Sequence, residues 1–400
     1  MSTPTSPPQK VICSSAADII AATPFLMGYT VTNSLVVLLL HNSVCRGAFR
    51  LALPGEAPLT EEQQRDIHDT IVGVIEPMSR VNEVALLFYT DRNTQNAAAL
   101  PHADCVVSVV RSLEGIGCRT LHALCVTADS WADYTSPETN PPEGFPFDEV
   151  MQSPVALTCA TSTNYPIDDI ERETEFPDMP EPLHRAVVTR CARVSHRPRE
   201  HTGVGRNWHD SHTVVARFYR VAQHGVFSIS ANQLAQLLGS LQREEHWFDL
   251  ASCLAMGETS WQRQHHQCVE RTGVTLREYL FRNPSGDLFP ASQRQGMLVA
   301  VLRELGSKQP ETELKREIAR ALGELASLAP DRLRPPLQAL RAYHWWLFGV
   351  PSIARQLLSA VPAPPRNPNR VSLFDAVSTV LQDTPHPRWV TDSHRAPKAA

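Results

Sequence analysis

The stretch from Ser34 to Leu40, "SLVVLLL", decides the fold class of this chain. Six apolar residues follow one serine without interruption, a length typical of a strand and short for a helix. A continuous apolar run is typical of a strand that is covered on both faces, as in the sheets of α/β proteins. We therefore expect an α/β domain around residues 34–40.

The neighbouring residues predict a partner strand and further elements. Residues 41–45 resemble a turn, and apolar residues alternate with others over 48–53, which predicts a half-buried strand in a hairpin with residues 34–40. Thr60 and Gln63 have the spacing of a capping box and predict a helix. Further strands are predicted at 11–13, 83–89, 121–127 and 154–160, and a further helix begins at Pro101. Strands that alternate with helices indicate an N-terminal α/β sandwich with a mixed, partly parallel sheet.

The stretch "TPFLMGY" (23–29) connects a capped helix to the first long strand. Ser15 and Asp18 have capping-box spacing at the start of that helix. Pro24 disfavours helical geometry before it, so the helix either kinks or a second turn opens, with Gly28 as a left-handed cap. The side chains expected to be buried beneath the next strand are Phe25, Leu26 and Tyr29.

The second half of the chain has helical periodicity from Trp208 onward. Apolar stripes at helical spacing occur over 234–241, 297–305, 314–325 and 353–361. Short helices with proline-marked turns indicate an all-α, tetratricopeptide-like domain of helical hairpins, although no 34-residue period is present. We expect Trp345 and Trp346 to be core residues between hairpins.

These patterns divide the chain into five segments. They are a disordered start (1–10), an α/β domain (11–182), a basic linker (183–207), an α-helical domain (208–361) and a proline-rich, helix-bearing segment with a disordered tail (362–400).

Four segments resemble an actinobacterial family known as domain of unknown function 4192. They are residues 14–40, with the Ser-Ala-Asp helix, the glycine turn and the Ser-Leu-Val-Val strand, and residues 46–54, 129–147 and 340–361. Family members often carry cysteines before the Pro-Glu-Gly turn, where this chain has Thr139-Asn-Pro-Pro142, so we expect no metal or redox role for that loop. The resemblance implies a fold and a host type, and it implies no activity.

Composition excludes several classes of protein. The net charge of −5 and the pI near 6.3 argue against nucleic-acid coating and against a polybasic membrane arm. No apolar run approaches the roughly 18 residues that a membrane span needs, and the first ten residues lack a signal core. The nine cysteines are odd in number and form no C-x-x-C pair, which predicts reduced thiols, no disulfide, no structural zinc and a cytoplasmic location.

Charge reverses sharply in the middle of the chain. Residues 129–182 hold thirteen Asp and Glu against one Arg, and residues 185–220 hold eight Arg against one Glu and one Asp. One explanation is that both segments are solvated surfaces and that the basic segment is a flexible linker. The alternative is that one of the two segments forms a face that binds a partner. The arginines expected to contact an acidic partner or an anionic ligand are Arg193, Arg197, Arg199 and Arg206. Neighbouring arginines disfavour a metal at the His209-x-x-His212 pair, and the backbone of 203–206 is an alternative anion site.

Two aspartates follow predicted strands, Asp91 after 83–89 and Asp129 after 121–127. Ligands of partly parallel sheets bind beyond the carboxyl ends of the strands, so both carboxylates could face one crevice and hold Mg²⁺ or act as acid and base. Asp also suits turns for local reasons. The sequence contains no Walker loop, nucleophile elbow, dinucleotide fingerprint or zincin helix, whereas a Ser/His/Asp site built from distant residues stays open.

Two classes of function follow. The first, which we favour, is a cytoplasmic protein-interaction or regulatory module without a cofactor. The alternative is an enzyme or binding protein for a small anionic metabolite or nucleotide, with its site near Asp91 and Asp129.

Overall fold

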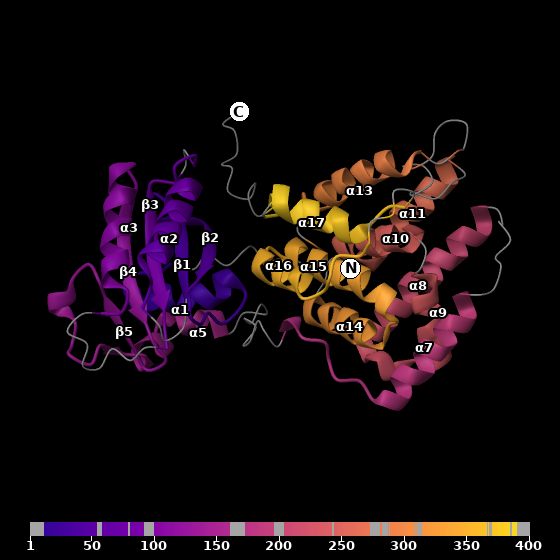
Figure 1. Ribbon diagram of the computed structural model, residues 1–400, viewed down its shortest axis with the longest axis horizontal. Coiled ribbons are helices and arrows are strands. Elements are labelled where there is room, and N and C mark those ends of the chain that lie inside the picture. The colour runs from indigo at the N-terminus through magenta and orange to yellow at the C-terminus, as the bar shows by residue number, and fades with distance from the viewer. Residues whose placement is uncertain are drawn as a thin grey trace. The chain divides into compact units, whose positions relative to one another are not determined.

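The computed structural model divides into two compact units, residues 1–170 and 171–400 (Figure 1). The residues that it describes are 12–53, 58–78, 81–91, 100–160, 173–195, 204–241, 244–272, 281, 287, 289–308, 310, 314–365, 367, 370–384 and 386–389. The predicted disordered start (1–10) and the last ten residues of the predicted tail lie outside this set.

The first unit contains a six-stranded mixed sheet in the order β2-β1-β3-β4-β5-β6. Its strands are β1 (Ser34–His41), β2 (Val44–Ala52), β3 (Glu83–Tyr89), β4 (Arg119–Val126), β5 (Ser130–Asp133) and β6 (Phe145–Pro146). β3 and β4 run parallel, and every other neighbouring pair is antiparallel. The predicted β1–β2 hairpin is confirmed, and its turn at Asn42 and Ser43 has positive φ angles, as a tight hairpin turn requires.

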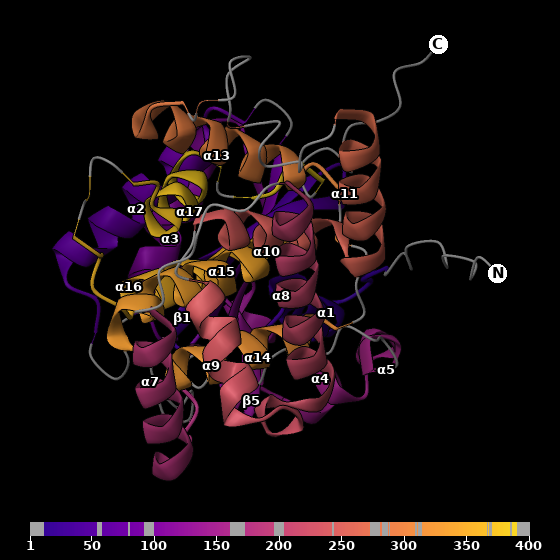
Figure 2. The ribbon, with the colours of Figure 1, turned by 90° about the vertical axis from the view of Figure 1, so that its right-hand side faces the viewer.

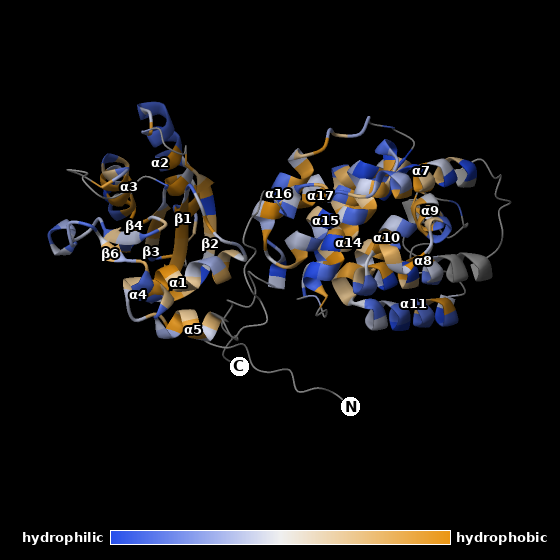
Figure 3. Ribbon diagram, turned by 90° about the horizontal axis from the view of Figure 1, so that it is seen from below, coloured by the Kyte–Doolittle hydropathy of each residue, from blue (hydrophilic) through white to orange (hydrophobic). Residues whose placement is uncertain are grey.

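Helices cover the sheet, as the apolar run of β1 predicts. They are α1 (Ala16–Met27), α2 (Glu61–Ile75), α3 (Ala103–Gly115), α4 (Asp148–Met151) and α5 (Pro154–Ala160). Alternate β1 residues, Leu35, Val37 and Leu39, share one core with apolar residues of α2 and α3. α1 contacts β2 and β4 and packs against α4 and α5. Val36 and Leu38 are buried as well, so β1 is covered on both faces; Figure 3 draws it largely in the hydrophobic colour.

Helix α1 runs through Pro24 without a break and ends at Gly28. Gly28 adopts the left-handed conformation (φ 80°), and its N–H donates to the carbonyl of Pro24 at 2.8 Å, so the predicted cap is confirmed. Tyr29 is buried as expected. The expected burial of Leu26 is wrong, since half of its surface is exposed; the continuous helix turns this side chain outward.

Two predicted strands are wrong. Residues 154–160 form helix α5, which begins at Pro154. The Ser153 hydroxyl caps its first turn by accepting a hydrogen bond from the Ala156 N–H at 3.0 Å. Ile12 and Cys13 form no strand, because Ile12 is largely exposed and the chain here leads into the α1 cap; Val11 lies outside the described residues. The short strands β5 and β6 were not predicted.

The second unit is helical, as predicted, and Figure 2 shows its helices packed side by side. They are α7 (Glu181–Ser195), α8 (Val204–His224), α9 (Ala231–Ser240), α10 (Glu244–Met256), α11 (Glu258–Thr272), α13 (Ala291–Leu305), α14 (Lys315–Leu328), α15 (Arg334–Leu347), α16 (Pro351–Ser359) and α17 (Leu373–Asp383). Residues 183–195 of the predicted linker therefore lie in α7. That helix packs against α9 and buries Val187 and Cys191, which explains why this segment is not a linker.

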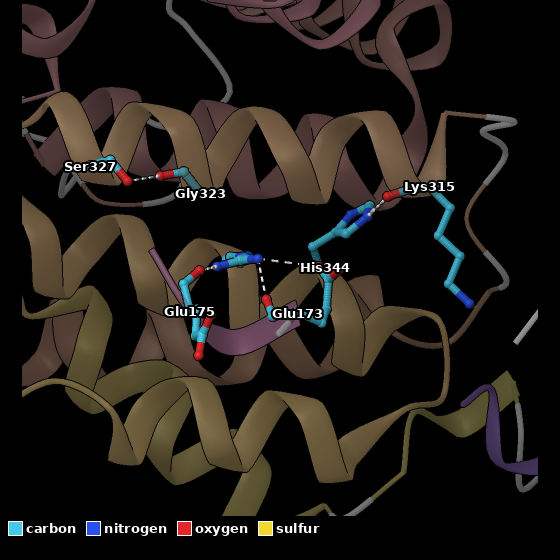
Figure 4. A network of polar contacts seen from close by, with 7 residues as sticks. Glu173, Glu175, Lys315, Gly323, Ser327 and His344 are labelled. Carbon is cyan, nitrogen blue, oxygen red and sulfur yellow. Dashed lines mark hydrogen bonds and ion pairs between the residues drawn. The ribbon is translucent and has the colours of Figure 1, made fainter. Parts of the chain in front are cut away.

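Helix α15 lies inside the helical unit, in contact with α14, α16 and α17. Trp345 and Trp346 are buried, which confirms the prediction that they belong to the core. The guanidinium of Arg341 is buried too, and it donates to the backbone carbonyls of Glu173 and Glu175 and to the Glu173 carboxylate (Figure 4). The core of this unit therefore contains a buried arginine whose terminal nitrogens are bound by Glu173 and Glu175.

Candidate functional site at the strand ends

The sheet topology collects polar residues at one edge of the α/β unit. β2, β3 and β4 end at this edge, and β1 begins there, because β1 is antiparallel to β2 and β3. Ser34 at the start of β1 pairs with Ala52 of β2 and Tyr89 of β3, and Tyr89 pairs with Val126 of β4. The Thr90 N–H extends this register by donating to the Val126 carbonyl at 2.9 Å.

Arg50 and Ser34 form a side-chain pair at this edge. Ser34 is fully buried, its hydroxyl accepts a hydrogen bond from Arg50 Nε, and it donates to the Thr32 carbonyl at 2.6 Å. Arg50 is half-buried. Within the described part of the chain the bond to Ser34 is the one hydrogen bond of this guanidinium, so its two terminal nitrogens have no described partner.

Asn33 holds Asp91 on the same edge. Asn33 has a positive φ of 40°, a backbone conformation that Asn tolerates better than most residues. Its side-chain oxygen accepts from the Asp91 N–H at 3.2 Å, and its amide nitrogen donates to the Asp91 carboxylate. We call Asn33, Ser34, Arg50 and Asp91 the strand-end cluster.

Asp129 lies in the turn between β4 and β5, at the same edge of the sheet. The Thr127 hydroxyl organises this turn, since it accepts from the Ser130 N–H at 3.0 Å and donates to the Ser130 carbonyl at 2.9 Å. The Asp129 side chain is exposed, and its backbone carbonyl accepts from the Phe147 N–H at 2.9 Å. The two aspartates thus share an edge but have different neighbours, and their joint action stays a prediction.

Of the four arginines predicted to bind a partner or an anion, the structure describes the side chain of one. Arg193 is exposed in the last turn of α7. Arg197 and Arg199 lie outside the described residues, and Arg206 lies in α8 with a side chain outside the described set. Among the residues that the structure describes, no group of three or more His, Cys, Asp and Glu is placed to hold a metal ion.

Sequence reasoning found Asp91 but missed Arg50 and Ser34. These two are sixteen positions apart, and only the hairpin register, which places Arg50 opposite Val36, brings the arginine next to Ser34. It also missed a buried polar group between α8 and α10, in which the Ser211 hydroxyl donates to the Asp249 carboxylate at 2.6 Å. Periodicity assigns such residues to a buried face and does not reveal their partners.

The fold and the strand-end cluster define a two-unit protein, with a mixed-sheet α/β unit that carries a polar edge and an all-helical unit. Within this class, the chain belongs to the family described as a domain of unknown function (DUF4192), whose model matches residues 17–265. The match includes the whole strand-end cluster and continues through α8 and α10 into α11.

No curated protein and no solved structure matches the chain. None of the helices that the structure describes has both the length and the apolar character to cross a membrane.

Proposed function

We propose that this chain is a cytoplasmic interaction or regulatory module whose α/β unit binds an anionic group at the strand-end cluster. The observation that carries the proposal is Arg50, a half-buried guanidinium that uses Nε to bind Ser34 and leaves its terminal N–H groups free of described partners. Six of the nine cysteines are buried as free thiols, which supports a reducing compartment.

Physical chemistry favours an anion at Arg50. A guanidinium binds carboxylate or phosphate through parallel N–H donors, and an orientation that is already fixed lowers the entropic cost of binding. The Ser34 hydroxyl fixes Nε, and Ser34 is itself held by Thr32. The place also agrees with the general rule that ligands of open α/β sheets bind beyond the carboxyl ends of strands.

Asp91 adds selectivity. Asn33, the neighbour of Ser34 in sequence, holds the Asp91 carboxylate. A carboxylate near the ligand repels an unaccompanied anion, whereas it accepts a hydrogen bond from a hydroxyl or ammonium group. The cluster therefore favours a ligand in which an anionic group and such a donor occur together, such as a nucleotide or an amino acid.

Thermal denaturation with a ligand panel tests this proposal. We expect inorganic phosphate, a nucleoside monophosphate or an amino acid to raise the melting midpoint. Each of these joins an anionic group to a hydroxyl or ammonium donor, and a ligand that binds the native state stabilises it. Arg50→Gln should abolish the shift. Arg111→Gln, which changes an exposed arginine on α3, is the matched control and should retain it. If Arg50→Gln kept the full shift, or if no anion shifted the wild type, the proposal would be wrong.

The basic segment supports a second candidate function, the capture of an acidic partner. By sequence, residues 185–220 carry a net charge of +6, and Arg193 is exposed on a helix whose opposite side is buried. Changing Arg193, Arg197, Arg199 and Arg206 to Gln should remove a co-purifying acidic protein while the melting midpoint changes little, since exposed ion pairs contribute about 0–1 kcal/mol each. Retention of every partner by that variant would contradict this candidate.

A further inference from the structure

A chain of hydrogen bonds links an aspartate, a histidine and a serine between α2 and α3. His68 on α2 lies 2.8 Å from the Asp69 carboxylate through Nδ1 and 2.6 Å from the Ser112 hydroxyl of α3 through Nε2. These two contacts put the proton of Nδ1 toward the carboxylate and leave Nε2 as the acceptor of the serine proton. His68 and Ser112 are half-buried, so neither is sealed from solvent.

A groove lies beside this chain of bonds. It has a volume of about 330 Å³ and is lined by Glu61, Gln64, Arg65, His68 and Ser108. Ser108 and Ser112 are four residues apart on α3 and therefore lie on the same face of the helix, one turn from each other. The groove thus reaches the imidazole that contacts Ser112, and this site is separate from the strand-end cluster.

We propose that Ser112 is a nucleophile activated by His68 and oriented through Asp69, and that the groove accepts an ester or another activated acyl compound. An alcohol becomes a competent nucleophile when a neighbouring base removes its proton, and a carboxylate on the far side of the imidazole fixes the required tautomer. The roles are defined by geometry and do not depend on the order of the residues in the chain.

The reaction is an acyl transfer to water in two steps. In the first, Ser112 Oγ forms a bond to the acyl carbon, its proton moves to His68 Nε2, and the bond to the leaving alcohol breaks as the alcohol takes that proton. In the second, water attacks the acyl carbon and gives a proton to Nε2. The acid then leaves while Ser112 Oγ recovers the proton. Arg65 also lines the groove, and its guanidinium is the kind of donor that a carbonyl oxygen gaining negative charge requires.

Labelling of the intact protein with a fluorophosphonate probe tests the proposal, with the modified residue located by mass spectrometry. We expect a single adduct on Ser112 in the wild type. Ser112→Ala should lose it, and His68→Gln should slow its formation by about 100-fold, as the loss of a general base does. Ser359→Ala is the matched control, since it changes an exposed serine of α16 that lies outside the groove, and its labelling rate should stay close to that of the wild type.

Circular dichroism and the melting midpoint identify any variant that fails to fold, and Asp69→Asn then serves as the milder substitution, with slower labelling and an intact Ser112. Absence of a Ser112 adduct in the folded wild type would overturn the proposal. So would labelling of Ser112 at an unchanged rate in folded His68→Gln, because the histidine would then not act as the base.

Discussion

Gly28 and Asp18 close the two ends of helix α1, each by its own chemistry. Gly28 supplies a positive φ at the C-terminus. At the N-terminus the Asp18 carboxylate accepts from the Ser14 N–H and hydroxyl at 2.9 Å each and from the Ser15 N–H at 3.1 Å. Burial raises the pKa of Asp18, but these hydrogen bonds outweigh burial and lower it below its usual value. Residues of the family resemblance therefore include structural caps.

A valine at position 28 should destabilise the α/β unit. A β-branched residue is strained at φ 80°, and we expect Gly28→Val to lower the free energy of unfolding by about 1–3 kcal/mol. Gly73→Val is the matched control, because Gly73 lies in α2 with no atom within 4 Å of an added Cβ, and it should change stability by no more than about 0.5 kcal/mol. Urea titration measures both, and equal midpoints for the two variants would contradict the strained cap.

At the scale of elements, residue patterns predict whether a segment is buried more reliably than whether it forms a strand or a helix. "SLVVLLL" and "PVALTCA" (154–160) are both short and apolar, and periodicity alone cannot separate a strand from a helix over seven residues. Pro154 and the preceding Ser153 cap decide for a helix. The residues of the candidate site also differ in how far the sequence predicts them. Asp91 follows a strand and could be predicted, whereas the Ser34–Arg50 pair depends on hairpin register, which one sequence does not reveal.

Helix α15 carries a buried histidine, His344, which lies next to Lys315 of α14. His344 is fully buried, its Nε2–H donates to the Lys315 carbonyl at 2.7 Å, and burial lowers its pKa to about 3 (Figure 4). The Lys315 ammonium lies 5.1 Å from the ring centroids of both Trp345 and Phe348, and burial lowers its pKa to about 8. The helical core therefore keeps His344 neutral at ordinary pH.

The His344 pKa predicts a stability that depends on pH. The unfolded chain binds a proton at this residue as pH falls through its ordinary pKa of 6.5, whereas the folded chain resists protonation until about pH 3. The unfolded state then holds more protons, so the free energy of unfolding should fall between pH 6.5 and 3, by at most about 1.4 kcal/mol per pH unit from this group.

Urea unfolding at a series of pH values between 7 and 4 checks this expectation. His344→Gln removes the titration but retains an amide donor for the Lys315 carbonyl, so its stability should fall less steeply toward acid than that of the wild type. His224→Gln changes an exposed histidine at the end of α8 and should keep the wild-type slope. A His344→Gln profile parallel to that of the wild type would refute the buried neutral histidine.

At the scale of the whole molecule, the family match covers residues of both units. It runs from residue 17 to residue 265, so it contains the entire sheet and ends in α11 of the helical unit. The charge reversal between 129–182 and 185–220 lies within the matched region. The strand-end cluster and the basic segment therefore both lie within the matched region, whereas α13 to α17 lie beyond it.

The central claim is that Arg50 receives an anion at the strand-end cluster, and nuclear magnetic resonance of the ¹⁵N-arginine-labelled full chain tests it most directly. The Arg50 Nε–H signal, assigned by its absence from Arg50→Lys, reports on the bond to Ser34. During titration with inorganic phosphate or a nucleoside monophosphate, we predict that the Arg50 Nε–H and backbone signals shift in a saturable manner while those of Arg111 stay in place. An Arg50 signal that does not move, or a shift of the same size and concentration dependence at Arg111, would contradict the account.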